Sequence, residues 1–159
     1  GLLLGNQGDL EAGKQAWLEA PAWQGLRRVV EDTWVLKDWF ELYVAQNVAL
    51  DGILFGLAYR EVDAALSEQA GPTVSMLTRF QAEWFQDANK WVDAVIKTAA
   101  AESAENQALL GQWYAHWRGR VQEALAPVAR LALGDAGDAA LARAVAAVDA
   151  RMHKSGLAV

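Results

Sequence analysis

Residues 33–59 read TWVLKDWFELYVAQNVALDGILFGLAY, and this stretch decides the fold. Its apolar side chains fall on every side of a helix axis, whereas a helix at an ordinary protein surface carries a single apolar stripe. A helix that is apolar all round needs neighbours on every side. The stretch therefore predicts a helix at the centre of an all-α bundle of long antiparallel helices.

Tryptophan is unusually frequent, with eight in the chain. Trp23, Trp113 and Trp117 lie outside the apolar stretch, so we expect part of its surface to be hidden against another subunit. Aromatic side chains commonly dominate such contacts. The candidates for this subunit interface are Trp34, Trp39, Phe40, Phe55, Trp84 and Trp91.

Composition limits the possible classes of function. The chain has 159 residues, of which 53% are apolar, and this fits a single helical domain over residues 1–159. A net charge of −6 argues against nucleic acid as a partner, because nucleic-acid binders usually carry a basic surface. The absence of cysteine excludes disulfides, zinc–thiolate sites, iron–sulfur clusters and thiol nucleophiles, and it favours the cytoplasm.

Prolines, glycines and capping residues predict where the helices begin and end. Asp9 and Asp138 are good N-caps, and Pro127 should kink or end the helix that contains it. A break near one of the glycines should divide the longest segment, and residues 154–159 should form a frayed tail. The expected helices cover residues 9–19, 23–69 with one break, 75–101, a segment from 103 or 105 to about 127, and 138–152.

The helix expected at residues 75–101 carries an apolar stripe. Its apolar residues recur at steps of three and four, which places them on one face of a helix. We expect this face to pack in the core. The stripe consists of Leu77, Phe80, Trp84, Ala88, Trp91, Val92, Val95 and Ala99.

Gln46, Asn47 and Asp51 interrupt the apolar stretch at residues 33–59. Buried polar groups are costly unless they are hydrogen-bonded, so one interpretation is an internally satisfied network. The other interpretation is the remnant of a polar site between helices. The same residues argue against a membrane span, because a carboxylate near the middle of a span is costly.

The sequence lacks the ligand pattern of a di-metal carboxylate site. In a helical bundle such a site takes Glu-x-x-His from each of two helices, because this spacing puts carboxylate and imidazole on one face. The residues three positions before His116 and His153 are Trp113 and Ala150. Phosphate-binding loops, G-x-S-x-G and H-E-x-x-H are absent as well. We therefore predict no catalytic, cofactor-binding or metal-ligating residue in this chain.

Two strings carry a resemblance to a known family. WQGLRRVVEDTWVLKDWFELYVAQNVALDGILFG (residues 23–56) and SMLTRFQAEWFQDANKWVDAVIKTAAAESAEN (residues 75–106) resemble the beta subunit of the hydroxylase of bacterial multicomponent di-iron monooxygenases. These enzymes oxidise phenols, toluenes, alkenes or methane, and the strings are most similar to those of phenol hydroxylases. Beta chains of the family are about twice as long, so the resemblance implies that residues 1–159 form a C-terminal half.

The resemblance implies a ferritin-like fold and a structural role. In this family the alpha subunit holds the di-iron centre, while the beta subunit has no metal site. Alpha, beta and gamma subunits form a trimer that pairs with a second copy, and a reductase and an effector protein act on the complex. The resemblance thus implies a non-catalytic subunit of a phenol-type hydroxylase. The alternatives are the beta subunit of an alkene, propane or methane monooxygenase, and a stand-alone helical scaffold.

The resemblance also implies a degenerate metal site. A ferritin-like helix at residues 75–101 should carry Glu-x-x-His toward the helix at residues 33–59. The nearest candidate is Asp87-Ala88-Asn89-Lys90, in which lysine takes the place of histidine. A protonated lysine donates hydrogen bonds but has no lone pair for a metal. One hypothesis is that Lys90 replaces the metal, paired with Asp87 or Glu41, and the other is that Lys90 lies in solvent.

Overall fold

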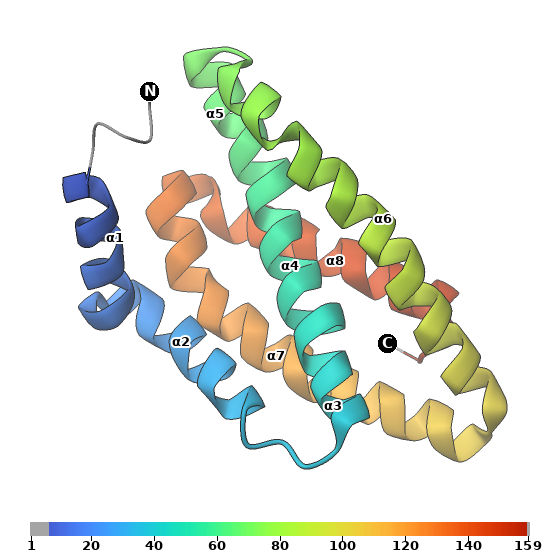
Figure 1. Ribbon diagram of the computed structural model, residues 1–159. Coiled ribbons are helices and arrows are strands. Elements are labelled where there is room, and N and C mark those ends of the chain that lie inside the picture. Colours follow the sequence, from blue (N-terminus) through green and yellow to red (C-terminus); the bar gives the residue numbers. More distant parts are fainter. Residues whose placement is uncertain (1–6, 159) are drawn as a thin grey trace.

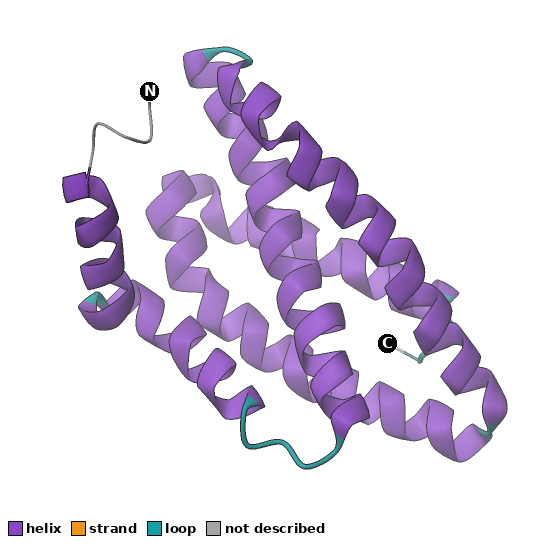
Figure 2. Cartoon of the chain, in the orientation of Figure 1, coloured by secondary structure: helices purple, strands orange, loops and turns teal. Residues whose placement is uncertain are grey.

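The computed structural model describes residues 7–158, and the elements of that range are all helical (Figures 1 and 2). The predicted all-α class is confirmed. Two π-helical segments, Val44–Leu50 and Leu57–Val62, and a 3-10 turn, Gly134–Ala136, interrupt the α-helices. The α-helices are α1 (Gln7–Glu19), α2 (Pro21–Thr33), α3 (Trp39–Tyr43), α4 (Asp51–Gly56), α5 (Asp63–Ala70), α6 (Thr73–Glu102), α7 (Ala104–Leu133) and α8 (Gly137–Lys154).

The elements α3, α4 and α5 and the two π-helical segments between them form one helix, here called the central helix (residues 39–70). It lies between α7 and α6, and α8 crosses behind it (Figure 1). The break in the predicted 23–69 segment falls at residues 34–38, so the prediction of a break near a glycine was wrong. Asp38 provides the reason, because its carboxylate caps the new helix by accepting hydrogen bonds from the backbone N–H groups of Phe40 and Glu41.

The core lies between the central helix and α7. Val44, Val48 and Ile53 are fully buried, and they pack in one apolar cluster with Tyr114 and Trp117 of α7. Burial of this many large side chains is the main source of stability in such a bundle. The residues Trp39–Gln69 form a helix that is long and apolar enough to span a membrane, but half of its most apolar window is buried inside the molecule, as in any core helix.

The π-helical segments keep one line of side chains directed at α6. In an α-helix, a side chain four positions further on is rotated by about 40° around the helix axis. A π-helical turn contains more residues, so it offsets this rotation. Residues of the central helix spaced by multiples of four consequently meet the same neighbour. Tyr43 packs on Trp91, and Tyr59 packs on Phe85. Asp63 accepts hydrogen bonds from Ser75 at 2.6 Å and Thr78 at 2.9 Å.

Helix α6 buries a different face from the one predicted. Its buried residues are Phe85, Val92, Ile96 and Ala100, so of the expected stripe only Val92 belongs to the core. The prediction that the stripe packs in the core was wrong for its largest members. In the described part of the chain, Leu77, Phe80, Trp84 and Trp91 remain between 60% and 76% exposed, although Tyr43 packs on one edge of Trp91.

The C-terminal third differs from prediction in three places. Helix α7 continues past Pro127 to Leu133, so it does not end at the proline. Asp138 lies in the first turn of α8 rather than at its N-cap, and its carboxylate pairs with Arg130 at 2.9 Å. The tail is packed up to Leu157, which is buried and whose N–H donates to the carbonyl oxygen of Met152.

Candidate functional site

Ion pairs between helices account for several of the partly buried charges. Arg118 of α7 donates to both carboxylate oxygens of Asp149 in α8, at 2.7 and 2.6 Å, and the Tyr114 hydroxyl donates to the same carboxylate at 2.7 Å. Burial opposes the charge of Asp149, but the hydrogen bonds from Arg118 and Tyr114 outweigh it and hold the pKa of Asp149 below its usual value. This cluster holds α8 against α7, and each of its three side chains is engaged in a hydrogen bond within it.

Two further ion pairs also connect neighbouring helices. Arg151 of α8 forms a bidentate pair with Asp93 of α6, with N–O distances from 2.8 to 3.1 Å. Arg120 of α7 pairs with Asp32 of α2 and lies over the ring of Trp117, 5.0 Å from its centroid. These contacts hold the surrounding helices in place.

The three positions predicted for a degenerate metal site are not brought together. Lys90 does pair with Asp87 at 2.8 Å, but the two side chains are 79% and 74% exposed and lie on the solvent face of α6. Glu41 is engaged elsewhere, because its carboxylate accepts a hydrogen bond from the indole nitrogen of Trp117 at 3.1 Å. The geometry gives no support to the hypothesis that Lys90 replaces a metal between the helices.

The polar residues of the central helix do not form the satisfied network. Gln46 is exposed, and the amide of Asn47 donates only to the backbone oxygen of Tyr43, one turn earlier. Within the described part of the chain, Asp51 has no hydrogen-bond or ion-pair partner, and burial raises its pKa to about 6. The buried hydroxyl of Tyr43 is also without a partner among the described residues. The geometry therefore does not support the internally satisfied network, and the remnant of a polar site between helices stays a hypothesis.

The side chains present do not fit a di-iron centre. Among the described residues, no three His, Asp or Glu side chains lie close enough together to hold a metal ion. Trp91 contacts Tyr43 of the central helix, and the residue three positions before Trp91 is Ala88. Counted from the contact between Trp91 and Tyr43, the Glu-x-x-His positions are Ala88 and Trp91, neither of which ligates iron. On the face of α6 that packs against the chain, the same spacing gives Asn89 and Val92, which provide neither a carboxylate nor an imidazole.

The lone carboxyl group of Asp51 leads to a pH prediction for the 159-residue chain. Its folded pKa of about 6 lies above the usual value, so its ionised form opposes folding and stability is lost as pH rises from 4 through 6. Asp51→Asn removes this loss and should stabilise the chain by about 1–2 kcal/mol at pH 7.5, after allowance for partial solvent exposure. Urea unfolding at pH 4 and pH 7.5 measures the difference, and a gain that is equal at both pH values would contradict it.

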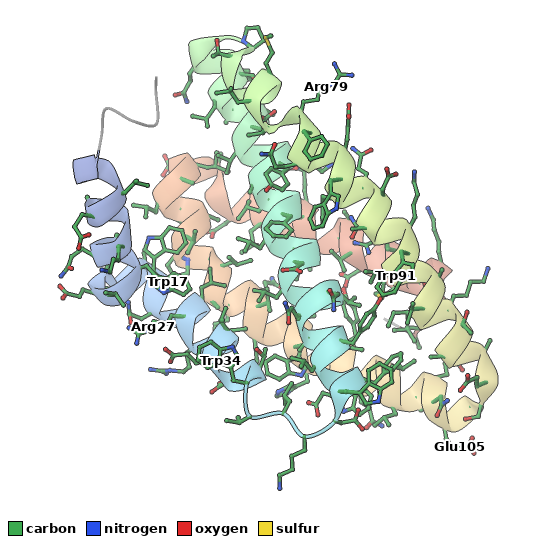
Figure 3. All side chains as sticks on the ribbon, in the orientation of Figure 1. Trp17, Arg27, Trp34, Arg79, Trp91 and Glu105 are labelled. Carbon is green, nitrogen blue, oxygen red and sulfur yellow. The ribbon has the colours of Figure 1, made fainter. Side chains whose placement is uncertain are left out.

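The candidate interface residues fall into two exposed groups and one internal group. Trp34 and Trp39 are 80% and 71% exposed and flank the connection between α2 and α3. Trp84 and Trp91 are 60% and 64% exposed and lie on α6, with Trp91 beside the central helix (Figure 3). The remaining two candidates are half-buried and make ring contacts inside the chain, namely Phe40 with Tyr43 and Phe55 with Phe85.

Comparison with known proteins identifies relatives along almost the whole chain. Residues 2–103 match the family described as methane/phenol/alkene hydroxylase. The chain is 45% identical to the oxygenase component DmpL of phenol 2-monooxygenase from Pseudomonas sp. (strain CF600), over 99% of this chain and 47% of that protein. It is 25% identical to the beta subunit of the hydroxylase component of the toluene-4-monooxygenase system from Ectopseudomonas mendocina, over 68% of this chain and 33% of that subunit.

A solved structure shares the fold. The crystal structure of xenon-pressurised phenol hydroxylase from Pseudomonas sp. OX1 matches with a TM-score of 0.88 and 37% identity, over 97% of this chain and 46% of that chain. The chain thus spans about half the length of the relatives that it matches. The resemblance found in residues 23–56 and 75–106 is confirmed, and the chain belongs to the methane/phenol/alkene hydroxylase family.

Proposed function

We propose that this chain is part of a non-catalytic structural subunit, the beta subunit, of a cytoplasmic multicomponent monooxygenase that hydroxylates phenol or a related aromatic compound with O2 and electrons from NAD(P)H. The 45% identity to a phenol 2-monooxygenase component favours phenol over toluene or propane, for which the identities are 25–28%. In this proposal the chain supplies helical surface rather than chemistry, because neither Ala88 and Trp91 nor Asn89 and Val92 of α6 provide Glu-x-x-His ligands.

The proposed partners are the alpha subunit, which would hold the di-iron centre, and the gamma subunit. A second copy of the trimer, a reductase and an effector protein would complete the system, without nucleic acid or membrane. The observation that carries this proposal is the pair of exposed indoles at Trp34 and Trp39, on a chain that belongs to a hydroxylase family. Trp39 also borders a cleft of about 430 Å³, which is formed with residues such as Trp113 of α7.

The proposal is tested by reconstitution with the full-length subunit. We expect it to co-purify with alpha and gamma subunits, and we expect phenol hydroxylation by the alpha subunit to fall at least tenfold when it is omitted. Stoichiometric iron in the purified subunit alone, or full phenol turnover without it, would contradict a structural role. A stable monomer that binds no other hydroxylase subunit would favour the stand-alone scaffold.

The exposed indoles give a prediction about assembly. The double substitution Trp34→Ala and Trp39→Ala should weaken binding of the full-length subunit to the alpha subunit at least tenfold, since buried tryptophans are typical binding hot spots. Leu131→Ala is the matched control, because Leu131 is 65% exposed on α7 and lies away from this connection. Binding of each variant to immobilised alpha subunit, followed by surface plasmon resonance, measures both affinities. Equal losses of affinity for the two variants would show that these tryptophans do not lie in the interface.

A further inference from the structure

A cleft opens where the start of α3, the end of α6 and the first half of α7 meet. Its volume of about 430 Å³ lies within the range of protein sites that enclose a small ligand, so it can admit a long side chain of a partner. Trp39 and Trp113 provide two indole rings to its wall, and Leu109 and Leu110 provide aliphatic side chains. Trp39 is 71% exposed and Leu109 is 41% exposed, so both can be reached from outside the chain.

Two carboxylates also line this cleft, Asp38 at the N-cap of α3 and Glu102 at the last residue of α6. Asp38 uses only its Oδ1 atom to cap α3, and Glu102 uses only its Oε2 atom, which accepts a hydrogen bond from the amide of Asn106 at 3.2 Å. Within the described part of the chain, the second oxygen of each carboxylate accepts no hydrogen bond, and no lysine, arginine or histidine lines the cleft. The cleft is therefore negatively charged and has acceptors available for a donor that enters it.

Indole rings next to carboxylates form a typical environment for a cation. The face of an indole attracts a positive charge, and a carboxylate accepts charge-assisted hydrogen bonds from it. Arginine suits this combination better than lysine, because its planar guanidinium can stack on an aromatic ring and donate to more than one acceptor at the same time. Arginine is also enriched, together with tryptophan, among the residues that dominate the energy of protein interfaces. The chemistry of the cleft thus favours an arginine side chain as its occupant.

We propose that this cleft is a docking site for an arginine side chain of the alpha subunit, whose guanidinium lies against the two indole rings and donates hydrogen bonds to Glu102 and Asp38. The inference rests on the proposed function, which supplies the partner, and it adds the type of residue that the partner inserts. Leu109 and Leu110 pack along the aliphatic part of that arginine. The cleft is continuous with the exposed pair Trp34 and Trp39, because Trp39 belongs to both.

Glu102→Gln tests the charge of the cleft in the full-length subunit. Glutamine keeps an oxygen that can accept the hydrogen bond from Asn106, so only the charge is removed. We expect the affinity for immobilised alpha subunit to fall about tenfold at roughly 0.05 M salt and much less at roughly 0.5 M, because salt screens the ion pair. Glu123→Gln is the matched control, since Glu123 is an exposed carboxylate of α7 outside the cleft. Equal losses for the two variants, or a loss that does not depend on salt, would overturn the inference.

Photo-cross-linking in the assembled hydroxylase identifies the residue that enters the cleft. p-Benzoylphenylalanine in place of Leu109 should cross-link the full-length subunit to a peptide of the alpha subunit that contains arginine. Replacing that arginine by alanine should weaken binding of the unchanged subunit about tenfold and binding of the Glu102→Gln variant less than about twofold, because the two substitutions remove one shared contact. A cross-link within the subunit's own polypeptide, or additive losses from the two substitutions, would overturn the inference alone. Failure of the full-length subunit to bind the alpha subunit at all would contradict the proposed function as well.

Discussion

Replacing Trp117 by alanine is expected to destabilise the folded chain by about 3–5 kcal/mol, the usual cost of deleting a large aromatic side chain from a core. Trp117 is 2% exposed and lies where α7 faces the central helix. Its loss opens a cavity, frees the carboxylate of Glu41 and removes the ring beneath the Arg120 guanidinium. For a chain of this size the melting temperature should fall by roughly 10 °C or more, as measured by circular dichroism.

Two companion variants separate packing from hydrogen bonding. Trp117→Phe keeps most of the buried area but loses the indole N–H donor to Glu41, and it should cost about 1–2 kcal/mol. Trp34→Ala removes the same kind of side chain from an 80% exposed position and should change the stability of the chain by less than about 0.5 kcal/mol. Equal losses at residues 117 and 34 would contradict the described core.

The second large effect is expected at Gly137, where α8 begins against α7. A Cβ atom on Gly137 would stand 2.6 Å from the carbonyl carbon and oxygen of Ala129 and 2.7 Å from the backbone nitrogen of Arg130. These are backbone atoms of a long helix, so they cannot move aside as a side chain could. Gly137→Ala should cost about 3 kcal/mol, at the upper end of what overpacking usually costs. Urea denaturation measures the change.

Gly119→Ala is the matched control within the same pair of helices. A Cβ atom at Gly119 meets nothing within 4 Å, and the residue lies in the middle of α7. Alanine should therefore stabilise the chain there by about 0.5–1 kcal/mol, because it restricts the unfolded backbone and is a better helix former. A destabilising effect at residue 119, or a neutral one at residue 137, would contradict the packing of α7 on α8.

The periodicity of apolar residues predicted the helices well, because burial and helix geometry both act through sequence spacing. The same periodicity could not tell which apolar face of α6 is covered by this chain. Phe85 and Trp84 are adjacent and both aromatic, yet Phe85 is buried and Trp84 is 60% exposed. The difference arises from a neighbour that approaches α6 on one side only, and such long-range packing is not encoded in the local pattern.

Two errors at helix ends had signals that could have corrected them. Asp38 and Glu41 have the spacing of a capping box, which marks the start of a helix at Trp39 more strongly than any glycine marks a bend. Gly156 has a positive φ of 96°, and the backbone N–H groups of Gly156 and Leu157 donate to His153 and Met152. This is a Schellman ending, which docks Leu157 instead of leaving a frayed tail.

The sequence predicted only part of the candidate site. Asp51 was recognisable as a polar residue in an apolar stretch, and its lack of a partner among the described residues follows from the fold rather than from the sequence. On α6, the acidic and basic residues Asp87 and Lys90 suggested replacements for metal ligands. The two charged side chains instead lie on the solvent-exposed face of α6, where they form an ion pair that does not affect the core.

The two π-helical segments determine how the central helix tolerates insertions and deletions. Each segment supplies extra residues per turn, and together they bring the side chains beyond residue 56 back into line with those before residue 44. Losing a single residue from the first segment, Val44–Leu50, would rotate everything downstream by about a quarter of a turn and point Tyr59 away from Phe85, its partner on α6. Insertions and deletions should therefore be tolerated in the connections between helices rather than within the central helix.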